Sequence, residues 1–340
     1  MVRSSISRRR FLATTAAAAI TPCVTITPCA APLRADDAAG KARIAITLDL
    51  EMSRDYPRRG MLEWDYQKGN LDEATKQYAM EAARIVAGHG GRIHFFCVGR
   101  VLEQENIDWL KDLAAAGHPI GNHTYDHVNV LATKTEETQF RFQRSPWLVE
   151  GKTAEQVIRE NIRLTSIALL ERAGVTAAGF RAPGGFAAGL SGSPDVQAML
   201  LELGFKWVSS QYPAHAAGAP KRKPGSEIYA GIVEAQKRAQ PFVYPSGLTE
   251  IPMSPISDVN AFRANFWQLD WYLEAIRQSV QWAIQSGGVF DFLAHPSCLV
   301  VEDPKFQAIE LICKLVNEAG DQAELVDLDA IASRVRSPSQ

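Results

Sequence analysis

Two histidines stand four positions apart in the segment GNHTYDH, which covers residues 121–127. This spacing would place the imidazoles of His123 and His127 on one face of a helical turn, close enough to bind one metal ion between them. Histidine pairs at this spacing also occur without a metal. Here the pair follows a predicted strand and a glycine, and only five other histidines occur in the sequence. We therefore expect His123 and His127 to be metal ligands.

Two acids end an apolar run near the start of the chain, in the segment TLDLE at residues 47–51. Burying a carboxylate is costly unless it is paired or bound to a metal, so acids rarely end an apolar strand without a partner. The alternative is that Asp49 and Glu51 are acids of a surface loop. A carboxylate and two histidines form a facial triad, which leaves coordination positions open for water and substrate as catalytic sites require.

Two further polar residues also stand at the ends of predicted strands. Arg181 opens the segment RAPGG at residues 181–185, and its guanidinium could hold a carboxylate in a fixed orientation through bidentate hydrogen bonds. His295 follows the most hydrophobic late strand, within the segment FLAHP at residues 292–296. The alternatives are a structural salt bridge for Arg181 and a hydrogen-bonded core histidine for His295.

The elements that must position these residues alternate between strands and helices from residue 41 onward. This alternation predicts an α/β fold in which helices pack outside a parallel sheet, with seven or eight strands in one domain. The polar segments then lie where active sites are built in such folds, at the C-terminal ends of strands. The predicted strands are 42–49, 93–98, 119–122, 178–181, 205–209, 248–253, 289–294 and 324–328. The predicted helices are 70–88, 106–116, 153–174, 193–204, 261–285 and 304–319, and the long loops are 52–69, 134–152 and 211–244.

Composition excludes several classes of protein. The 340 residues are 22% charged and 46% hydrophobic, which is typical of a globular protein and not of disorder, collagen or coiled coil. Lys and Arg total 36 against 38 Asp and Glu, so the sequence lacks the basic excess expected for nucleic-acid binding. The longest apolar run, residues 11–20, is far shorter than the roughly 20 residues of a membrane-spanning helix.

Residues 1–35 have the order of a secretory signal: adjacent arginines, a short apolar stretch rich in Ala and Thr, and a small-residue exit. Arginines 8–10 followed by Phe-Leu resemble the twin-arginine signal. We expect cleavage after Ala35, export to the periplasm or the extracellular space, and a catalytic domain over residues 36–340. The alternative is an Arg-rich disordered tail. The three remaining cysteines are an odd number, so we expect no disulfide framework.

Taken in order, the four polar segments resemble those of the polysaccharide deacetylases of carbohydrate esterase family 4. The segments are TLD at 47–49, GNHTYDH at 121–127, RAPGG at 181–185 and LAH at 293–295, and the resemblance covers residues 43 to about 299. It implies a distorted (β/α) barrel of seven or eight mainly parallel strands. It also implies a divalent metal, most often zinc, and hydrolysis of N-acetyl or O-acetyl groups on a glycan such as peptidoglycan or a chitin-like oligomer.

The resemblance also implies roles for individual residues. Asp49 corresponds to the catalytic base, His295 to the general acid and Arg181 to the residue that orients Asp49. A base would take the proton from the attacking water and an acid would protonate the departing amine. The other assignments are metal binding by His123 and His127 and substrate binding by Gly184, through its backbone N–H, and Leu293.

The first segment departs from the common family pattern, which has two adjacent acids with the second binding the metal. Leu50 occupies that second place here, and the next acid is Glu51. A subgroup with acid-x-acid spacing includes peptidoglycan deacetylases and enzymes that open cyclic amides such as allantoin. Residues 49 and 51 of a strand point to the same side, so we expect Glu51 to be the metal carboxylate. The alternative is that Asp49 itself binds the metal.

The acid that usually accompanies the late histidine of the family is also absent. Ser209 and Ser210 stand near its place, and Asp291 is the candidate substitute. Two other functions therefore stay open beside metal-dependent deacetylation. One is a cyclic-amide hydrolase of the allantoin type on the same fold, and the other is a secreted glycan-binding module that has lost activity through Leu50.

Overall fold

The computed structural model describes residues 40–53, 56 and 67–335. The predicted signal at residues 1–35, with its cleavage site, lies outside the described residues, and so do residues 36–39 of the predicted catalytic domain. Among the described residues, no helix is long and apolar enough to cross a membrane. The three cysteines in this part of the chain, Cys97, Cys298 and Cys313, are buried and unpaired, in agreement with the sequence-based expectation.

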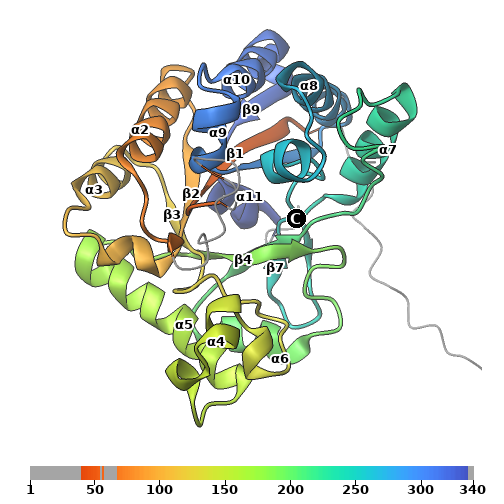
Figure 1. Cartoon of the computed structure of the whole chain (residues 1–340). Helices are drawn as coiled ribbons and strands as arrows, with labels where there is room; N and C mark the ends of the chain where they lie inside the picture. The colour runs from red at the N-terminus through yellow and green to blue at the C-terminus, as the bar shows by residue number, and fades with distance from the viewer. Residues whose placement is uncertain (1–39, 54–55, 57–66, 336–340) are drawn as a thin grey trace, which may run out of the picture. The chain divides into compact units, whose positions relative to one another are not determined.

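A mostly parallel sheet curls into a half-barrel with helices around it, which confirms the predicted distorted (β/α) barrel (Figure 1). The strands follow the order β6-β7-β5-β4-β3-β2-β1-β8, with β9 beside β1. Among the strands of the described residues, only the β6–β7 pairing is antiparallel. The described strands are β1 (Ala42–Leu50), β2 (Ile93–Cys97), β3 (Ile120–Asn122), β4 (Gly179–Phe186), β5 (Trp207–Gln211), β6 (Phe242–Val243), β7 (Thr249–Glu250), β8 (Val289–Ala294) and β9 (Ala323–Leu325).

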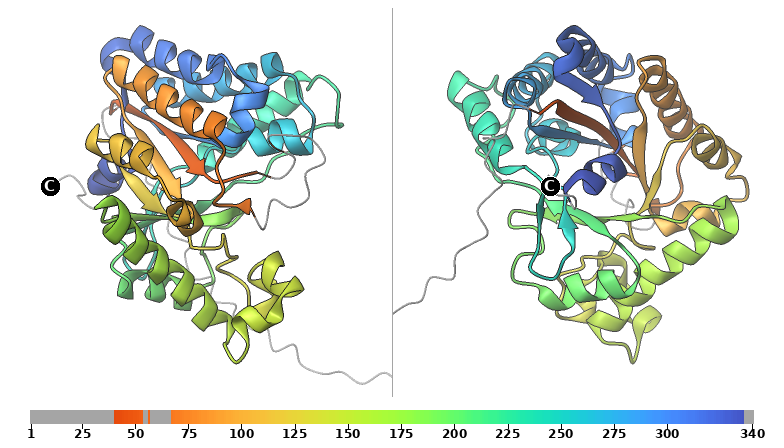
Figure 2. Two further views of the ribbon diagram at one scale, coloured as in Figure 1. Left: turned by 60° about the vertical axis from the view of Figure 1, so that its left-hand side comes forward. Right: turned by 180° about the vertical axis from the view of Figure 1, so that it is seen from behind.

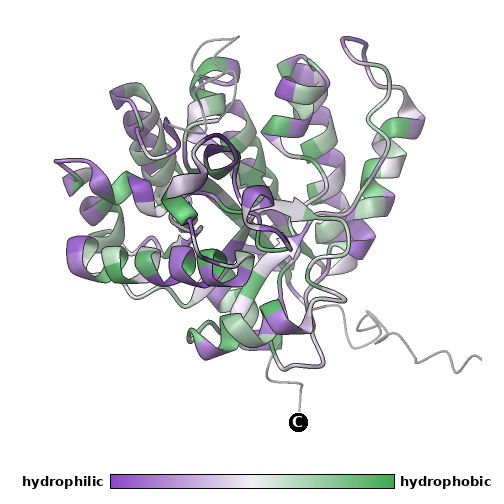
Figure 3. Ribbon diagram, turned by 60° about the horizontal axis from the view of Figure 1, so that its bottom comes forward, coloured by the Kyte–Doolittle hydropathy of each residue, from purple (hydrophilic) through white to green (hydrophobic). Residues whose placement is uncertain are grey.

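The helices cover the outer face of the sheet and are two-sided, with apolar residues on one side and polar residues on the other (Figure 3). Five α-helices lie in the first part of the described chain: α2 (Glu73–Gly88), α3 (Asp108–Ala115), α4 (Phe140–Arg144), α5 (Ala154–Ala168) and α6 (Pro194–Glu202). Five more follow: α7 (Ser226–Arg238), α8 (Leu269–Ser286), α9 (Pro296–Glu302), α10 (Gln307–Ala319) and α11 (Leu328–Val335). Short 3-10 and π segments are η1 (Gly99–Glu103), η2 (Thr135–Glu137), η3 (Pro146–Val149), η4 (Leu169–Ala173), η5 (Val259–Ala264) and η6 (Gly320–Gln322).

Strand β1 shows how the sequence separates the two faces of the sheet. Ile44, Ile46 and Leu48 join the large apolar core between the sheet and the helices. The alternate residues point into the half-barrel, because successive side chains of a strand face opposite sides. Thr47 accordingly donates to the carboxylate of Asp291 at 2.8 Å across the interior.

The terminal helix α11 packs at the end of the half-barrel where the strands begin (Figure 2). Leu328 and Ile331 share an apolar cluster with Ala45 and Trp207, and the indole Nε1 of Trp207 donates to Asp329 Oδ1 at 2.7 Å. The opposite end, where the strands finish, is left for a pocket.

Three predicted segments are wrong in detail. The loop expected over 134–152 contains the short helix α4, between the 3-10 segments η2 and η3. The single helix expected over 261–285 is broken: η5 ends at Ala264, Phe266 has a positive φ of 54°, and α8 begins only at Leu269. The loop expected over 211–244 contains α7, whose buried residues Tyr229, Ile232 and Ala235 have helical spacing. Gly231 within this run, and the Pro and Gly residues of the segment before it, obscure the helical pattern in the sequence.

Candidate active site

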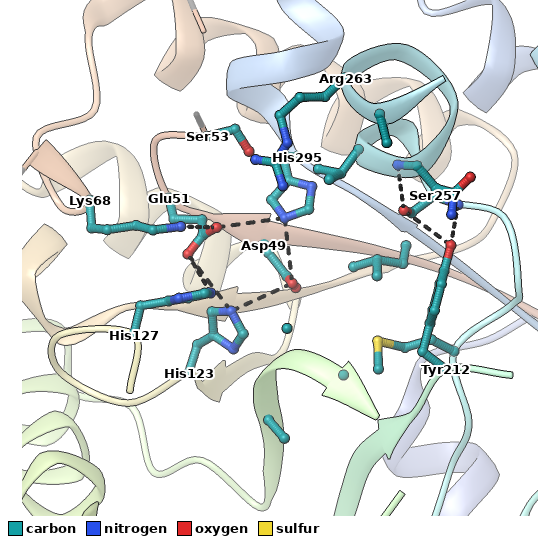
Figure 4. Close-up of a pocket in the computed structure, with 18 residues that line it drawn as sticks. Asp49, Glu51, Ser53, Lys68, His123, His127, Tyr212, Ser257, Arg263 and His295 are labelled. Carbon is teal, nitrogen blue, oxygen red and sulfur yellow. Dashed lines mark hydrogen bonds and ion pairs between the residues drawn. The ribbon is translucent and has the colours of Figure 1, made fainter. Parts of the chain in front are cut away.

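A cavity of about 380 Å³ opens at the C-terminal ends of the strands, and it gathers residues that are far apart in the sequence (Figure 4). Seven of the eight residues singled out from the sequence line it: Asp49, Glu51, His123, His127, Gly184, Leu293 and His295. The eighth, Arg181, is fully buried beneath the cavity.

Glu51, His123 and His127 form a group with the geometry of a metal site. Glu51 Oε2 lies 3.1 Å from His127 Nε2 and 3.9 Å from His123 Nε2, and one ligand atom from each residue lies within 4.8 Å of the others. Ligands about 2.1 Å from a tetrahedral zinc ion are roughly 3.4 Å apart. Glu51 Oε2 is buried without a hydrogen-bond partner, as a cation ligand in a metal-free structure would be. These donors therefore fit a divalent cation.

The two imidazoles are held in the form that binds metal. His123 Nδ1 lies 2.8 Å from the backbone carbonyl of Arg181, which can only accept, so Nδ1 carries the proton and Nε2 offers its lone pair to the cavity. Burial lowers the pKa of His123 to about 4. Burial, followed by the positive charge of Lys68, also holds the pKa of His127 well below its ordinary value. Both rings are thus neutral at neutral pH.

The two histidines lie in a loop after β3 and not on a helical turn, so the predicted local structure is wrong. Thr124 and His127 have positive φ angles of 59° and 60°. Asn122 Oδ1 accepts the backbone N–H of Thr124 at 2.9 Å, and Thr124 Oγ1 accepts that of Val128 at 2.9 Å. These side-chain bonds replace helical hydrogen bonds and turn the chain sharply. The ring centroids of His123 and His127 still come within 4.9 Å.

Asp49 lines the cavity beside the group of Glu51, His123 and His127, with Oδ2 3.6 Å from His123 Nε2. Its Oδ1 is buried without a hydrogen bond, 3.8 Å from Arg181 Nε. Burial raises the pKa of Asp49, although the charge of Arg181 opposes this shift. The carboxyl therefore holds a proton more readily than an ordinary aspartate.

Arg181 makes its close contacts with residues other than Asp49. Its Nη2 donates to Asp291 Oδ2 at 2.8 Å and to Thr47 Oγ1 at 2.9 Å, and its guanidinium stacks over the ring of Phe96 at 4.3 Å. Arg181 therefore does not hold Asp49 through bidentate hydrogen bonds, and its Nε lies 3.8 Å from Asp49 Oδ1. Arg181 instead gives Asp49 a fixed positive neighbour inside the half-barrel.

His295 is paired with Asp258, a residue that the sequence analysis missed. His295 Nδ1 lies 2.9 Å from Asp258 Oδ1, and the backbone N–H of His295 donates to Asp258 Oδ2 at 2.7 Å. The suggested substitute Asp291 is wrong, because it bonds Arg181 and Thr47. Burial alone would lower the pKa of His295, but the carboxylates of Asp258, Asp49 and Glu51 together outweigh burial and raise it, with Asp258 contributing most. Asp258 also caps the N-terminus of η5. An aspartate directly before a helical segment is a common capping residue, and this is the sequence feature that could have pointed to Asp258.

The remaining expected residues shape the cavity. Gly184 and Gly185 have positive φ angles of 81° and 63°, a conformation that residues with a Cβ rarely adopt, and they form an irregularity in the pairing of β4 with β5. Leu293 of β8 lines the cavity and is 8% exposed. Lys68, which falls in a predicted loop, also lines the cavity and donates to Glu51 Oε1 at 2.5 Å. Sequence analysis had no signal for it.

Comparison with known proteins agrees with the resemblance seen in the sequence. Residues 62–206 match the family model described as "Polysaccharide deacetylase", and this segment includes His123, His127 and Arg181. No curated protein sequence matches the chain. The family model confirms the predicted resemblance over residues 62–206.

Solved structures share the fold at low sequence identity. A protein assigned as a polysaccharide deacetylase from Mycobacterium smegmatis aligns with a TM-score of 0.60 and 18% identity, over 92% of this chain and 97% of that chain. The allantoinase Puue aligns with a TM-score of 0.56 and 14% identity, over 86% and 90%. Another protein assigned as a polysaccharide deacetylase, from Pseudomonas aeruginosa PAO1, aligns with a TM-score of 0.56 and 14% identity, over 86% and 89%. At these identities the likeness shows the fold alone.

Proposed function

We propose that this chain, a relative of the polysaccharide deacetylases, is a metal-dependent hydrolase that removes acetyl groups from an N-acetylated or O-acetylated glycan, such as peptidoglycan or a chitin-like oligomer. On an N-acetyl group the bond broken is a carbon–nitrogen bond outside a peptide. The observation that carries the proposal is the convergence in one cavity of three metal-type ligands, a carboxyl group and an imidazole backed by a carboxylate.

Glu51, His123 and His127 would hold the cation, which we take to be zinc because imidazole nitrogens and a carboxylate suit it. When bound, such a cation supplies a Lewis acid that polarises the acetyl carbonyl and lowers the pKa of water. Neutral rings at His123 and His127 favour this binding, because a protonated imidazole has no lone pair to offer.

Asp49 and His295 provide the proton transfers. Asp49 Oδ2 and His295 Nε2 lie 3.9 Å apart, so both groups can reach one reacting acetyl group. Asp49 takes the proton from the attacking water. Its Oδ1, which has no hydrogen bond, lies 3.8 Å from Nε of the buried Arg181. His295, whose pKa is raised chiefly by the Asp258 carboxylate, donates its proton to the departing nitrogen or oxygen. The backbone N–H of Gly184 and the side chain of Leu293 would contact the substrate at the cavity wall.

An extended substrate is favoured by a second hollow that adjoins the cavity. This hollow, about 360 Å³ in volume, shares His127 and Gly184 with the cavity and continues to Phe140 and Phe186. Phe140 is 41% exposed. Exposed aromatic rings offer flat apolar faces against which the C–H face of a sugar ring packs. A small cyclic amide would not need this continuation, whereas a glycan chain would use it.

An acetate-release assay with the metal-loaded protein tests the proposal. Peptidoglycan fragments, N-acetylglucosamine oligomers and acetylxylan are offered in parallel with allantoin, each with and without a chelator. Acetate release that the chelator abolishes supports the proposed function. Allantoin turnover without metal supports the cyclic-amide alternative. The acid-x-acid spacing of Asp49 and Glu51 is the sequence feature that favours this alternative. Glycan binding without acetate release supports the inactive module.

We also propose that the protein is exported to the periplasm or the extracellular space, where glycan polymers are found, because residues 1–35 have the residue order of a secretory signal. Cell fractionation of a strain that expresses the full chain tests this step. Replacing Arg8 and Arg9 by lysine should keep the protein in the cytoplasm with its N-terminus uncleaved. Export of that variant at the normal level contradicts the twin-arginine assignment.

A further inference from the structure

A buried lysine contacts the carboxylate of the metal-type group. Lys68 Nζ lies 2.5 Å from Glu51 Oε1, and the side chains of Lys68 and Glu51 are only 2% and 3% exposed. Figure 4 shows the ammonium reaching Glu51 inside the cavity, within the same cluster as His123 and His127. Lys68 is thus a charged part of the candidate metal site.

The two oxygens of Glu51 have different surroundings. Oε1 accepts the bond from Lys68 and lies 3.7 Å from His295 Nε2. Oε2 faces His127 Nε2 at 3.1 Å and His123 Nε2 at 3.9 Å. The ammonium therefore occupies one oxygen and leaves the other to the two imidazoles, so a cation between those rings would share Glu51 with Lys68.

The charge of Lys68 beside Glu51 should affect both the stability of the metal-free protein and its affinity for a metal. A buried carboxylate is strongly destabilising unless a positive charge accompanies it, so Lys68 stabilises the fold when no metal is bound. Once a divalent cation binds Glu51 Oε2, the ammonium becomes a like charge on the other side of the same carboxylate. At such short range, and away from water, that repulsion is large.

We propose that Lys68 is an internal counter-ion of Glu51 that stabilises the metal-free protein and weakens metal binding, so that it sets the affinity of the site. The inference rests on the proposed metal site. Lys68 acts through Glu51 and is therefore a positioning residue and not a metal ligand.

Metal affinity in Lys68→Met tests the proposal, because methionine keeps most of the volume and removes the charge. Zinc binding is measured by competition with a chelating dye, and unfolding temperatures are measured with and without zinc. We expect Lys68→Met to bind zinc on the order of tenfold or more tightly than the wild type. We also expect it to unfold at a lower temperature without metal and to gain more stability when zinc is added. Lys68→Arg, which keeps the charge, should stay close to the wild type.

Two further variants separate charge from general damage. Lys111→Met removes a lysine from an exposed ion pair with Asp108 and should change neither readout. Glu51→Gln added to Lys68→Met removes the uncompensated charge, so it should restore part of the lost metal-free stability, a coupling that a double-mutant cycle measures. This second readout stands even if the single Lys68 variant is too unstable to bind zinc.

Unchanged or weaker zinc binding by a folded Lys68→Met protein overturns the proposal, as does a double variant that is less stable than Lys68→Met alone. The proposed function fails differently. In that case the wild type binds no zinc, or it binds zinc equally well after His123→Ala.

Discussion

Both oxygens of Asp258 are bonded to His295: Oδ1 lies 2.9 Å from the ring Nδ1, and Oδ2 accepts the backbone N–H at 2.7 Å. This arrangement fixes the ring and places its Nε2 in the cavity, 3.9 Å from Asp49 Oδ2. It also opposes the effect of burial, which alone would lower the pKa of His295. A buried imidazole is thereby prepared to act as an acid.

Removing the Asp258 charge should change the pH dependence of turnover. Asp258 raises the pKa of His295 above its ordinary value, so Asp258→Asn should lower that pKa. The acid form of His295 then persists only to a lower pH, and the alkaline limb of the kcat/KM profile should move to lower pH. Metal content, measured on the same samples, should not change. A profile with an unmoved alkaline limb would remove His295 as the group that titrates there.

His295 itself should matter for proton transfer and not for metal binding. His295→Ala should keep its metal and slow turnover on an N-acetylated substrate by on the order of 10²-fold or more, the usual range for a lost general acid. Steady-state kinetics combined with elemental analysis checks both parts. Near-normal rates on an amide substrate would assign His295 to packing.

The histidine ligands should behave in the opposite way. His123→Ala and His127→Ala each leave two ligands of three, so both variants should lose most of the bound metal and with it the activity. The wild type should hold close to one divalent ion per chain. His118→Ala is a useful comparison, because His118 is a buried histidine that accepts the backbone N–H of Ile93 outside this cavity. Unchanged metal content in both ligand variants would move the site elsewhere.

Phe140 should contribute to binding of long substrates only. Phe140→Ala removes the exposed ring of the second hollow, so KM for long oligomers should rise several-fold while a monosaccharide or disaccharide substrate is unaffected. Leu164→Ala, another partly exposed apolar residue, serves as the control on the outer face of α5. Equal effects on short and long substrates would argue against a glycan chain in this hollow.

Sequence patterns predicted local features well where one residue's neighbours along the chain decide its structure. The helix predicted to start at residue 153 is found as α5, which begins with a capping box between Thr153 and Gln156, and β8 covers the predicted residues 289–294. The acids at the end of β1 also lie inside as the alternation of a strand requires, with Asp49 and Glu51 both lining the cavity.

The features that were missed depend on contacts between distant segments. Asp258 reaches His295 across 37 positions, and no period in the sequence links the two. Lys68 meets Glu51 only because the chain returns to the cavity after β1. The left-handed turn at Thr124 and His127 is set by side-chain bonds to the backbone, which compete with helix formation without changing the four-residue spacing.

Metal content of Glu51→Gln and Asp49→Asn, measured side by side, tests the central claim most directly. Glu51 Oε2 lies within 4 Å of the imidazoles of both His123 and His127, whereas Asp49 comes that close to only one of these two rings, that of His123. We therefore predict that Glu51→Gln loses metal and activity together. Asp49→Asn should keep its metal and lose only turnover, because the base is needed for the proton and not for coordination. Retained metal in Glu51→Gln, with loss in Asp49→Asn, would contradict the account and make Asp49 the ligand.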